Sequence, residues 1–467
     1  MQPFSNTHTR KPKSLLVGLL LGCLPLVGLA QQEVPSQLNL TLAQCIEYGL
    51  QYNLALRTAK LDIDDAYQSE REALSRGLPN LDATFDLTRN EVIQRIFLPG
   101  TFVGDVTPGA VVPAEFGTDY TSTLGLSFSQ MVFDGTFFVA LKASKALREL
   151  TARTAQRTEV QTAEAITKAY YSAQVALVNL AIVQANIERL EKQVADAEAT
   201  YKNGLGEKVD VDRITVQLYN TQTQYDNAEL LANLTLNQLK YQMGLRQDIA
   251  LTLAERITPD NLPNFREDLT KAFDYTTRIE YQVLQANRAL LEQDVRQYQV
   301  GYYPNVYLFA NGGANTGSGQ LPVVNSSYWS GYLAYGLRVN IPIFDGFLKD
   351  SRIQRARVGL QKVENQLYDT ENALALEYEN ARVSMTNAIR SLELQERNVA
   401  LAEEVLRVSR VKYAEGVGGS LEVVDAESAL KEAQTNYLGA LLDAYIAQVD
   451  LKKSLGILHT PAEYPVK

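Results

Sequence analysis

The chain contains two copies of one sequence pattern. The triplet Phe133-Asp134-Gly135 recurs as Phe344-Asp345-Gly346, the Tyr-x-x-Gly segment 201–204 recurs at 413–416, and Met243-Gly244-Leu245 is matched by Leu455-Gly456-Ile457. The members of each pair are 211 or 212 residues apart. Because this offset holds along the chain, the sequence predicts two tandem units of about 200 residues and not a solenoid of short repeats. We expect a first copy at 31–250, a linker at 251–267, a second copy at 268–458 and a C-terminal tail at 459–467.

The first 30 residues are typical of a secretory signal peptide. Basic residues at 10, 11 and 13 precede an apolar run from 15 to 29, and Gly28-Leu29-Ala30 has the small residues of a cleavage site. The segment Leu20-Leu21-Gly22-Cys23 also resembles a bacterial lipobox, which would make Cys23 a lipid anchor. We favour cleavage after Ala30, because apolar residues continue beyond Cys23. Both alternatives predict a protein that leaves the cytoplasm.

The composition argues against catalysis and against nucleic acid. The chain has two His and two Cys, and cleavage after Ala30 would leave only Cys45 and His459. One residue of each kind cannot form a disulfide framework, a thiolate–imidazole pair or a zinc cluster within one chain. The formal net charge of −10 does not favour binding to phosphate backbones. We therefore expect no enzyme activity, no catalytic residues, no cofactor, no metal site and no nucleic-acid partner.

Each copy is predicted to contain one very long helix. Between Ile166 and Tyr201, small and apolar residues alternate at spacings of three and four, which is the period of a coiled coil. Residues 135–204 contain no internal Pro or Gly, so one helix there would be about 100 Å long at 1.5 Å per residue. Its counterpart at 346–416 has only Gly359 inside it.

Shorter helices are predicted to cover the long ones. Glycines at 204 and 206 and from 416 onward permit a chain reversal, after which we expect helices at 208–243 and 421–455. These are too short to cover a long helix alone. Further helical stretches at 40–76 and 268–300 are expected to lie end to end with them.

The hydrophobic period changes to two beyond the helix breaks at Pro79 and Pro304. Apolar residues alternate with polar ones at 81–88, 124–129 and 333–341. One apolar and one polar face is what a membrane barrel strand requires. A solvent-facing β-sandwich would show the same alternation, but the signal peptide and the order of elements favour a barrel. Residues 90–119 and 311–328 are rich in Gly, Pro, Ser and Asn, which predicts exposed loops.

The predicted strands imply an oligomer. Four strands per chain are too few for a barrel, because the smallest barrels use about eight. Open strand edges in lipid would leave backbone groups unpaired, at a cost of several kcal/mol each. Several chains are therefore expected to contribute four strands each.

Two residues of the duplicated triplet have structural roles. Asp134 and Asp345 stand where an N-cap belongs, so their carboxylates are expected to accept from free amides of the helix start. Phe133 and Phe344 precede the caps and are expected to pack like a hydrophobic staple.

Together these features resemble the TolC-like outer-membrane factor (outer-membrane efflux protein) family. The likeness rests on the signal peptide, the duplication, the helix-Pro-Asn-strand order, the duplicated Phe-Asp-Gly and the two Tyr-x-x-Gly turns, and it covers about residues 38–458. It implies an α+β membrane protein, in which a trimeric twelve-stranded β-barrel is continued by a long antiparallel coiled-coil α-helical tunnel. The implied function is a passive outer-membrane exit duct of a tripartite efflux or type I secretion system. The implied partners are two further copies of the chain, outer-membrane lipid, a periplasmic adaptor protein and an inner-membrane transporter.

The resemblance also implies functional residues. Glu422 and Asp425 match an acidic pair that lines the family's periplasmic constriction, and their spacing of three places them on one helix face. The alternative is that both acids only complement the dipole of a helix start. Asp210 and Tyr413 match residues that close the tunnel tip. The family's basic partner in this closure falls on Gly418, so the salt bridge has no match here.

The Gly-rich turns are expected to contact the adaptor, because exposed tips can bind a partner without disturbing the packed walls. Their glycines are Gly204, Gly206, Gly416 and Gly418.

Two other function classes are open on the sequence. A coiled-coil structural or adhesive surface protein would explain the heptads but not the duplicated strand pairs. A periplasmic enzyme would need a convergent polar site, and no Asp or Glu cluster lies outside the predicted helix faces and turns. The cargo of a duct is not specified, because ducts for drugs, metals and proteins have similar walls.

Overall fold

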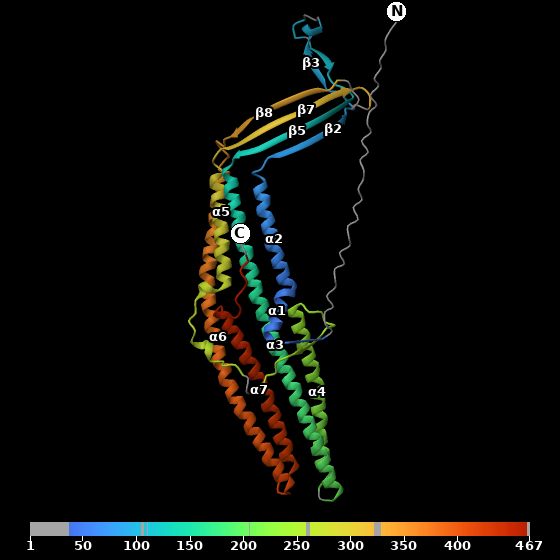
Figure 1. Cartoon of the computed structure of the whole chain (residues 1–467), viewed down its shortest axis with the longest axis vertical. Helices are drawn as coiled ribbons and strands as arrows, with labels where there is room; N and C mark the ends of the chain where they lie inside the picture. Colours follow the sequence, from blue (N-terminus) through green and yellow to red (C-terminus); the bar gives the residue numbers. More distant parts are fainter. Residues whose placement is uncertain are drawn as a thin grey trace, which may run out of the picture.

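The protein is an elongated molecule with a β-sheet at one end and long helices that extend from it (Figure 1). The computed structural model describes residues 37–103, 107–109, 111–204, 206–257, 262–321 and 328–464. The predicted signal peptide, with Cys23 and Ala30, lies outside the described residues.

Both predicted long helices are present. Helix α3 (Gly135–Lys202) has 68 residues and α6 (Leu348–Ala414) has 67. Within α3, most of the predicted coiled-coil positions are buried: Ile166, Ala169, Ala173, Ala176, Ile187, Leu190 and Ala197. No helix in the described part of the chain combines the length and apolarity that crossing a membrane requires.

The shorter helices cover the long ones end to end, as predicted. Helices α2 (Leu54–Ser75) and α4 (Lys208–Met243) follow each other along α3 (Figure 1). Helices α5 (Ile279–Val300) and α7 (Ser420–Ser454) do the same along α6. We refer to α3/α4 as the first hairpin and to α6/α7 as the second hairpin.

The start of α3 has the predicted cap and staple. Asp134 accepts a hydrogen bond from the amide of Thr136 at 2.8 Å, and Phe133 meets Phe138 with ring centroids 6.3 Å apart. The second copy differs, because Gly346 and Phe347 both have positive φ and delay the start of α6 to Leu348. Asp345 still accepts from the amide of Lys349 at 3.2 Å, but Phe344 packs on Phe347 and forms no staple.

Two predicted helices were too long. The stretch predicted at 40–76 is divided into α1 (Leu42–Tyr52) and α2, because Asn53 adopts ψ 129° and caps α2 with its side chain. Its amide nitrogen also donates to the carbonyl of Gln242 at 2.8 Å, a contact with α4 that the sequence does not reveal. Helix α5 begins at Ile279 and not at 268, because two 3-10 turns, Glu267–Thr270 and Tyr275–Thr277, precede it.

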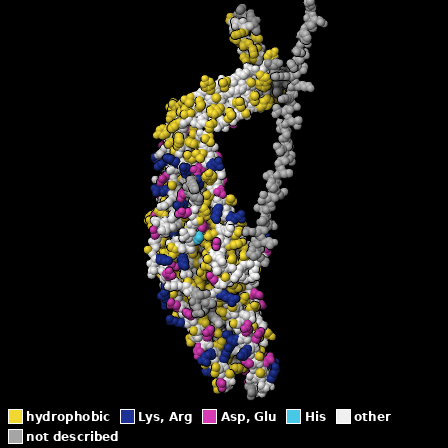
Figure 2. All heavy atoms as spheres, in the orientation of Figure 1, with side chains coloured by type: hydrophobic (Ala, Val, Ile, Leu, Met, Phe, Trp, Pro, Cys, Tyr) yellow, Lys and Arg dark blue, Asp and Glu magenta, His cyan; other side chains and the backbone are white. Residues whose placement is uncertain are grey.

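Four antiparallel strands form the sheet. Strands β2 (Asn80–Arg89), β5 (Tyr120–Phe133), β7 (Asn305–Ser318) and β8 (Ser330–Asn340) lie in the order β2-β5-β7-β8. The apolar residues of the alternating pattern are exposed, except for the half-buried Phe128. Hydrophobic side chains gather over the sheet, while charged ones are spread over the helices (Figure 2). No second sheet packs on it within the described ranges, so the β-sandwich alternative was wrong.

The segment 90–119 is not a plain loop, contrary to the prediction. It contains a hairpin of β3 (Arg95–Pro99) and β4 (Val111–Glu115) with a 3-10 turn at Gly100–Val103. These two short strands were not predicted, because the proline and glycine content of the segment favours loops. The segment 311–328 was also misjudged, because β7 continues to Ser318. A further unpredicted pair, parallel β1 (Gln37–Leu40) and β6 (Ala250–Leu253), connects the ends of the first copy.

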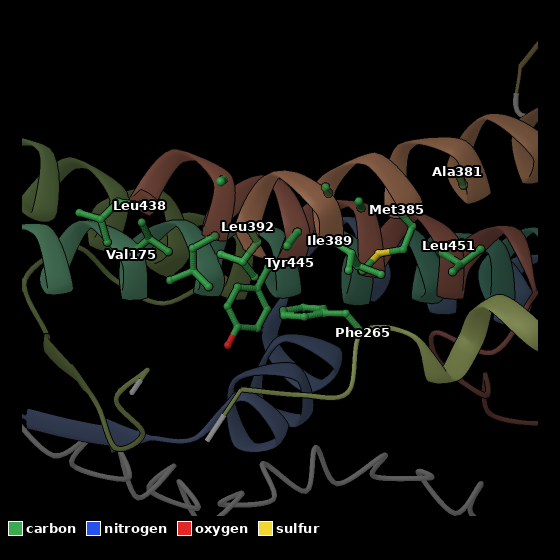
Figure 3. Packing of buried hydrophobic residues seen from close by; sticks show 14 of the residues in the cluster. Val175, Phe265, Ala381, Met385, Ile389, Leu392, Leu438, Tyr445 and Leu451 are labelled. Carbon is green, nitrogen blue, oxygen red and sulfur yellow. The ribbon is translucent and has the colours of Figure 1, made fainter. Parts of the chain in front are cut away.

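The main core lies at mid-height of the helices. There α3, α6 and α7 bury a cluster around Tyr445, whose ring meets that of Phe265 edge-on at 5.3 Å (Figure 3). The Tyr445 ring also stacks on Tyr171, with centroids 4.1 Å apart. A neighbouring cluster joins α1, α3 and α4 around Ile166 and Met243. Nearer the tips, one cluster lies inside the first hairpin and another inside the second. Among the described residues, no apolar cluster near the tips contains side chains of both hairpins, so the cores there are separate.

Candidate pore constriction and hairpin tips

The tips of both hairpins are tight glycine turns at the end of the molecule opposite the sheet (Figure 1). Gly204 and Gly416 each adopt φ +72°, a conformation that side-chain-bearing residues rarely take. Gly418 has no positive φ, but a Cβ there would lie 3.0 Å from Cβ of Lys412. At Gly206 the nearest atom would be Cγ2 of Thr200 at 3.2 Å. Positive φ therefore favours glycine at 204 and 416, whereas at 206 and 418 a Cβ would require a neighbour to shift by a few tenths of an ångström.

Asp210 links the two hairpins. It lies in the first turn of α4, and its Oδ1 accepts a hydrogen bond from the hydroxyl of Ser420, the first residue of α7. Arg213 completes the group, since its Nη1 donates to Ser420 Oγ at 3.3 Å and lies 3.5 Å from Asp210 Oδ1. Ser420 is buried. The predicted closure residue Asp210 thus binds the start of α7, through a serine and an arginine that the sequence analysis missed.

Tyr413 lies close to this group but has a different role. It packs against the apolar cluster of the second hairpin, which contains Leu406, Val423 and Leu430. Burial raises the pKa of its hydroxyl, and the charge of Asp210 raises it further. No hydrogen bond joins Tyr413 to Asp210 in the described part of the chain, so the contribution that the structure supports for Tyr413 is packing.

Glu422 and Asp425 are both exposed on one face of α7. Neither side chain forms an ion pair or hydrogen bond with the residues that the structure describes. The equivalent positions of the first copy are Asp210 and Arg213, which pair with each other. Glu422 stands in the first turn, where the helix dipole favours an acid, but Asp425 lies beyond that turn. The dipole alternative therefore explains Glu422 better than it explains Asp425.

A charged group between the hairpins was also missed. Glu427 on α7 is only 5% exposed, and its two carboxylate oxygens bind Arg189 of α3 at 3.0 Å and Arg410 of α6. About two turns further along α7, Gln434 accepts a hydrogen bond from Asn186 of α3 at 3.1 Å. The sequence contained a signal for this buried charge. Positions 420, 423, 427 and 430 follow the coiled-coil spacing of three and four, and Glu427 places a charge in that series, whose members are all buried in the structure.

The chemistry of the described residues gives no metal or nucleophilic site. No group of three or more His, Cys, Asp or Glu among them could hold a metal ion. Cys45 is buried, and burial raises the pKa of its thiol to about 12. His459 is bound to Glu159 at 2.8 Å and serves to attach the tail to α3.

Comparison with known proteins identifies the family. The sequence model of the family described as "Outer membrane efflux protein" matches residues 46–245 and 278–457, one segment in each predicted copy and together more than half of the chain. Outer membrane protein TolC of Escherichia coli K12 is 23% identical over 468 residues, covering 96% of this chain and 87% of TolC.

Solved structures share the fold. VceC of Vibrio cholerae superposes with a TM-score of 0.67 at 21% identity, covering 89% of this chain and 96% of VceC. The CmeC outer membrane channel of Campylobacter jejuni gives a TM-score of 0.70 at 15% identity, covering 91% of this chain and 87% of CmeC.

The matches agree with the duplication, with the four strands per chain and with the long helices. They exclude the adhesive surface protein and the periplasmic enzyme as alternatives. The chain belongs to the outer membrane efflux protein family, and it is a non-enzymatic outer-membrane channel of the tripartite efflux and secretion type whose helices extend into the periplasm.

Proposed function

We propose that three copies of this chain form one closed barrel of twelve strands in outer-membrane lipid. The observation that carries the proposal is the sheet itself, which has unpaired edges at β2 and β8 and an exposed apolar face. Unpaired backbone groups in lipid cost several kcal/mol each. Pairing β2 of one copy with β8 of the next would satisfy both edges and close the ring.

The helices continue this barrel as a periplasmic duct, and α7 supplies its constriction. Three copies bring six carboxylates, from Glu422 and Asp425, close to one axis. Support comes from their exposure on one helix face and from the absence of a pairing cation among the described residues. A ring of acids attracts cations and slows anions, as charged rings do in other channels. Asp210 and Tyr413 hold the tip in its closed arrangement, Asp210 by its bond to Ser420 and Tyr413 by packing.

The partners are a periplasmic adaptor protein and an inner-membrane transporter. The adaptor contacts the turns at Gly204, Gly206, Gly416 and Gly418, because these tips are the parts of the duct farthest from the membrane sheet (Figure 1). The transporter supplies the energy and selects the cargo, and the chain itself conducts passively.

Two measurements on detergent-solubilised protein test the proposal. Native mass spectrometry is expected to give a trimer, and the same sample in planar bilayers is expected to conduct cations in preference to anions. A stable monomer that keeps its full strand content would exclude the shared barrel. A trimer without cation preference would exclude the acidic constriction while leaving the barrel intact.

A further inference from the structure

Near the tips, the two hairpins are joined to each other by polar groups. The apolar clusters there are internal, one formed by α3 and α4 and the other by α6 and α7. The main core at mid-height contains α3, α6 and α7 together. The second hairpin is therefore anchored at mid-height by burial, while nearer the tips its position depends on bonds between side chains.

Glu427 is the most buried of the charged groups that make these bonds. Its carboxylate lies between cations from two different helices, Arg189 on the first hairpin and Arg410 on the second. It is the only acid that either arginine meets in the described part of the chain. Both Nε atoms are buried without a hydrogen-bond acceptor there. Arg189 also donates to Asn186 Oδ1 at 2.7 Å, but Glu427 supplies the negative charge that neutralises each guanidinium.

The position of Glu427 connects this group to the constriction. It follows Asp425 by two residues and Glu422 by five, and it lies on the buried face of α7 while those two acids lie on the exposed face. Any movement of α7 away from α3 at this level would carry Glu422 and Asp425 with it.

We propose that Glu427 is a positioning residue that keeps the second hairpin against the first and thereby keeps the channel narrow. The inference rests on the proposed function, because it assigns a control to the same constriction. Glu427 acts by neutralising Arg189 and Arg410 together. Without its charge, the two guanidinium groups repel each other across the hairpin boundary, and α6 and α7 move outward from α3.

Three variants separate repulsion from loss of packing. Glu427→Gln keeps the shape of the side chain and leaves both cations, so we expect the conductance of the resting channel in planar bilayers to rise at least about tenfold. Arg189→Met removes the bond between hairpins without creating repulsion, so its rise is expected to be smaller. The double variant removes the repulsion as well, and its conductance is expected to fall below that of Glu427→Gln. If Glu427 and Arg189 contributed packing alone, the double variant would conduct more than either single variant.

The matched control is Glu404→Gln. Glu404 forms an exposed pair with Arg407 at 2.7 Å within α6 and does not touch the first hairpin. The Glu404→Gln variant is expected to have the conductance of the wild-type channel. Wild-type conductance for Glu427→Gln, or a double variant that conducts more than Glu427→Gln, would overturn the inference. If Glu427→Gln yields no trimer, Arg189→Met decides: a raised conductance supports the inference, and wild-type conductance overturns it. The wild-type trimer and its cation preference are measured first, so failure of the proposed function is seen separately.

Discussion

Ser420 donates its hydroxyl to Asp210, and this bond joins the first residue of α7 to the first turn of α4. The two residues are 210 positions apart in the chain. The bond lies at the tips, where no apolar cluster of the described residues is common to both hairpins, so we expect it to affect tip position more than a bond inside a packed helix pair would.

Asp210→Ala is expected to raise the conductance of the closed channel. The change leaves the buried hydroxyl of Ser420 without its carboxylate, a loss of about 1–3 kcal/mol for a buried polar group. Trimer stability on gels should remain at the wild-type level, because the barrel is far from the tips. Asp212→Ala is the control, since Asp212 is exposed and has no partner among the described residues. Equal conductance in the two variants would refute the link.

Tyr413 offers a test of packing against hydrogen bonding. Because its side chain packs in the cluster of the second hairpin and makes no hydrogen bond to Asp210 in the described structure, Tyr413→Phe should leave closed-state conductance near wild type. Tyr413→Ala removes the ring, which costs about 3–5 kcal/mol at a fully buried site and less at this partly buried one, and should raise conductance. Single-channel recordings of both variants decide the matter. A large effect of Tyr413→Phe would show that the hydroxyl is needed.

Features that depend on residues close together in the sequence could be predicted from it. The bounds of α4, Lys208–Met243, coincide with the prediction, because glycine turns mark both of its ends. The apolar residues of β2 and β8 were recognised because alternation with period two is visible along one strand. The cap at Asp134 and the staple at Phe133 likewise depend on neighbours within five residues.

The features that the sequence analysis missed depend on contacts between distant residues. Arg189 and Glu427 are 238 positions apart, so nothing in either local pattern pairs them. The break at Asn53 is strengthened by a bond to Gln242, 189 positions away. In β3 and β4, Pro99 and Pro113 argued against strands, yet a two-stranded hairpin can place proline at edges where no ladder bond is required.

The C-terminal tail is expected to detach from α3 in acid. Glu159 accepts hydrogen bonds from His459 at 2.8 Å, from Tyr464 at 3.0 Å and from the amide of Ala462 at 3.2 Å. Burial raises the pKa of Glu159, but these bonds outweigh it and hold the pKa below the usual glutamate value. The contribution of Glu159 to docking is therefore fully present above the usual glutamate pKa. It is lost as the pH falls through the lowered pKa that Glu159 has in the docked state.

A spin label on Glu463→Cys would report this detachment, because residue 463 is exposed and the buried Cys45 thiol, with a pKa raised to about 12, should not react. Label mobility should increase as the pH is lowered. In Glu159→Gln, which weakens docking by about 1–3 kcal/mol, the label should be more mobile than in wild type even at neutral pH. Constant mobility from about pH 7 to about pH 3 would contradict the prediction.

Bulky residues at the turns should prevent transport in cells. Gly206→Trp and Gly418→Trp would enlarge the tips that we propose as the adaptor contact, and at Gly418 even a Cβ approaches Lys412 within 3.0 Å. Growth in the presence of a transported toxin measures the effect, and trimer yield shows that assembly is intact. Gly359→Trp is a control on α6 away from the tips, where a Cβ meets no atom within 4 Å. Normal resistance with both tip variants would place the adaptor elsewhere.

The acidic pair gives the sharpest test of the constriction. Glu422→Gln combined with Asp425→Asn removes six charges from the axis of a trimer while keeping the shape of each side chain. Selectivity for cations over anions should fall, and block by multivalent cations should weaken about tenfold or more, because a ring of like charges concentrates counter-ions at its centre. The control is Glu207→Gln combined with Asp212→Asn, which removes the same charge from exposed sites at the tip of the first hairpin. If both double variants change block equally, the acids act through total charge at the tips. If the first retains wild-type selectivity and block, Glu422 and Asp425 are helix-start residues that do not line the pore.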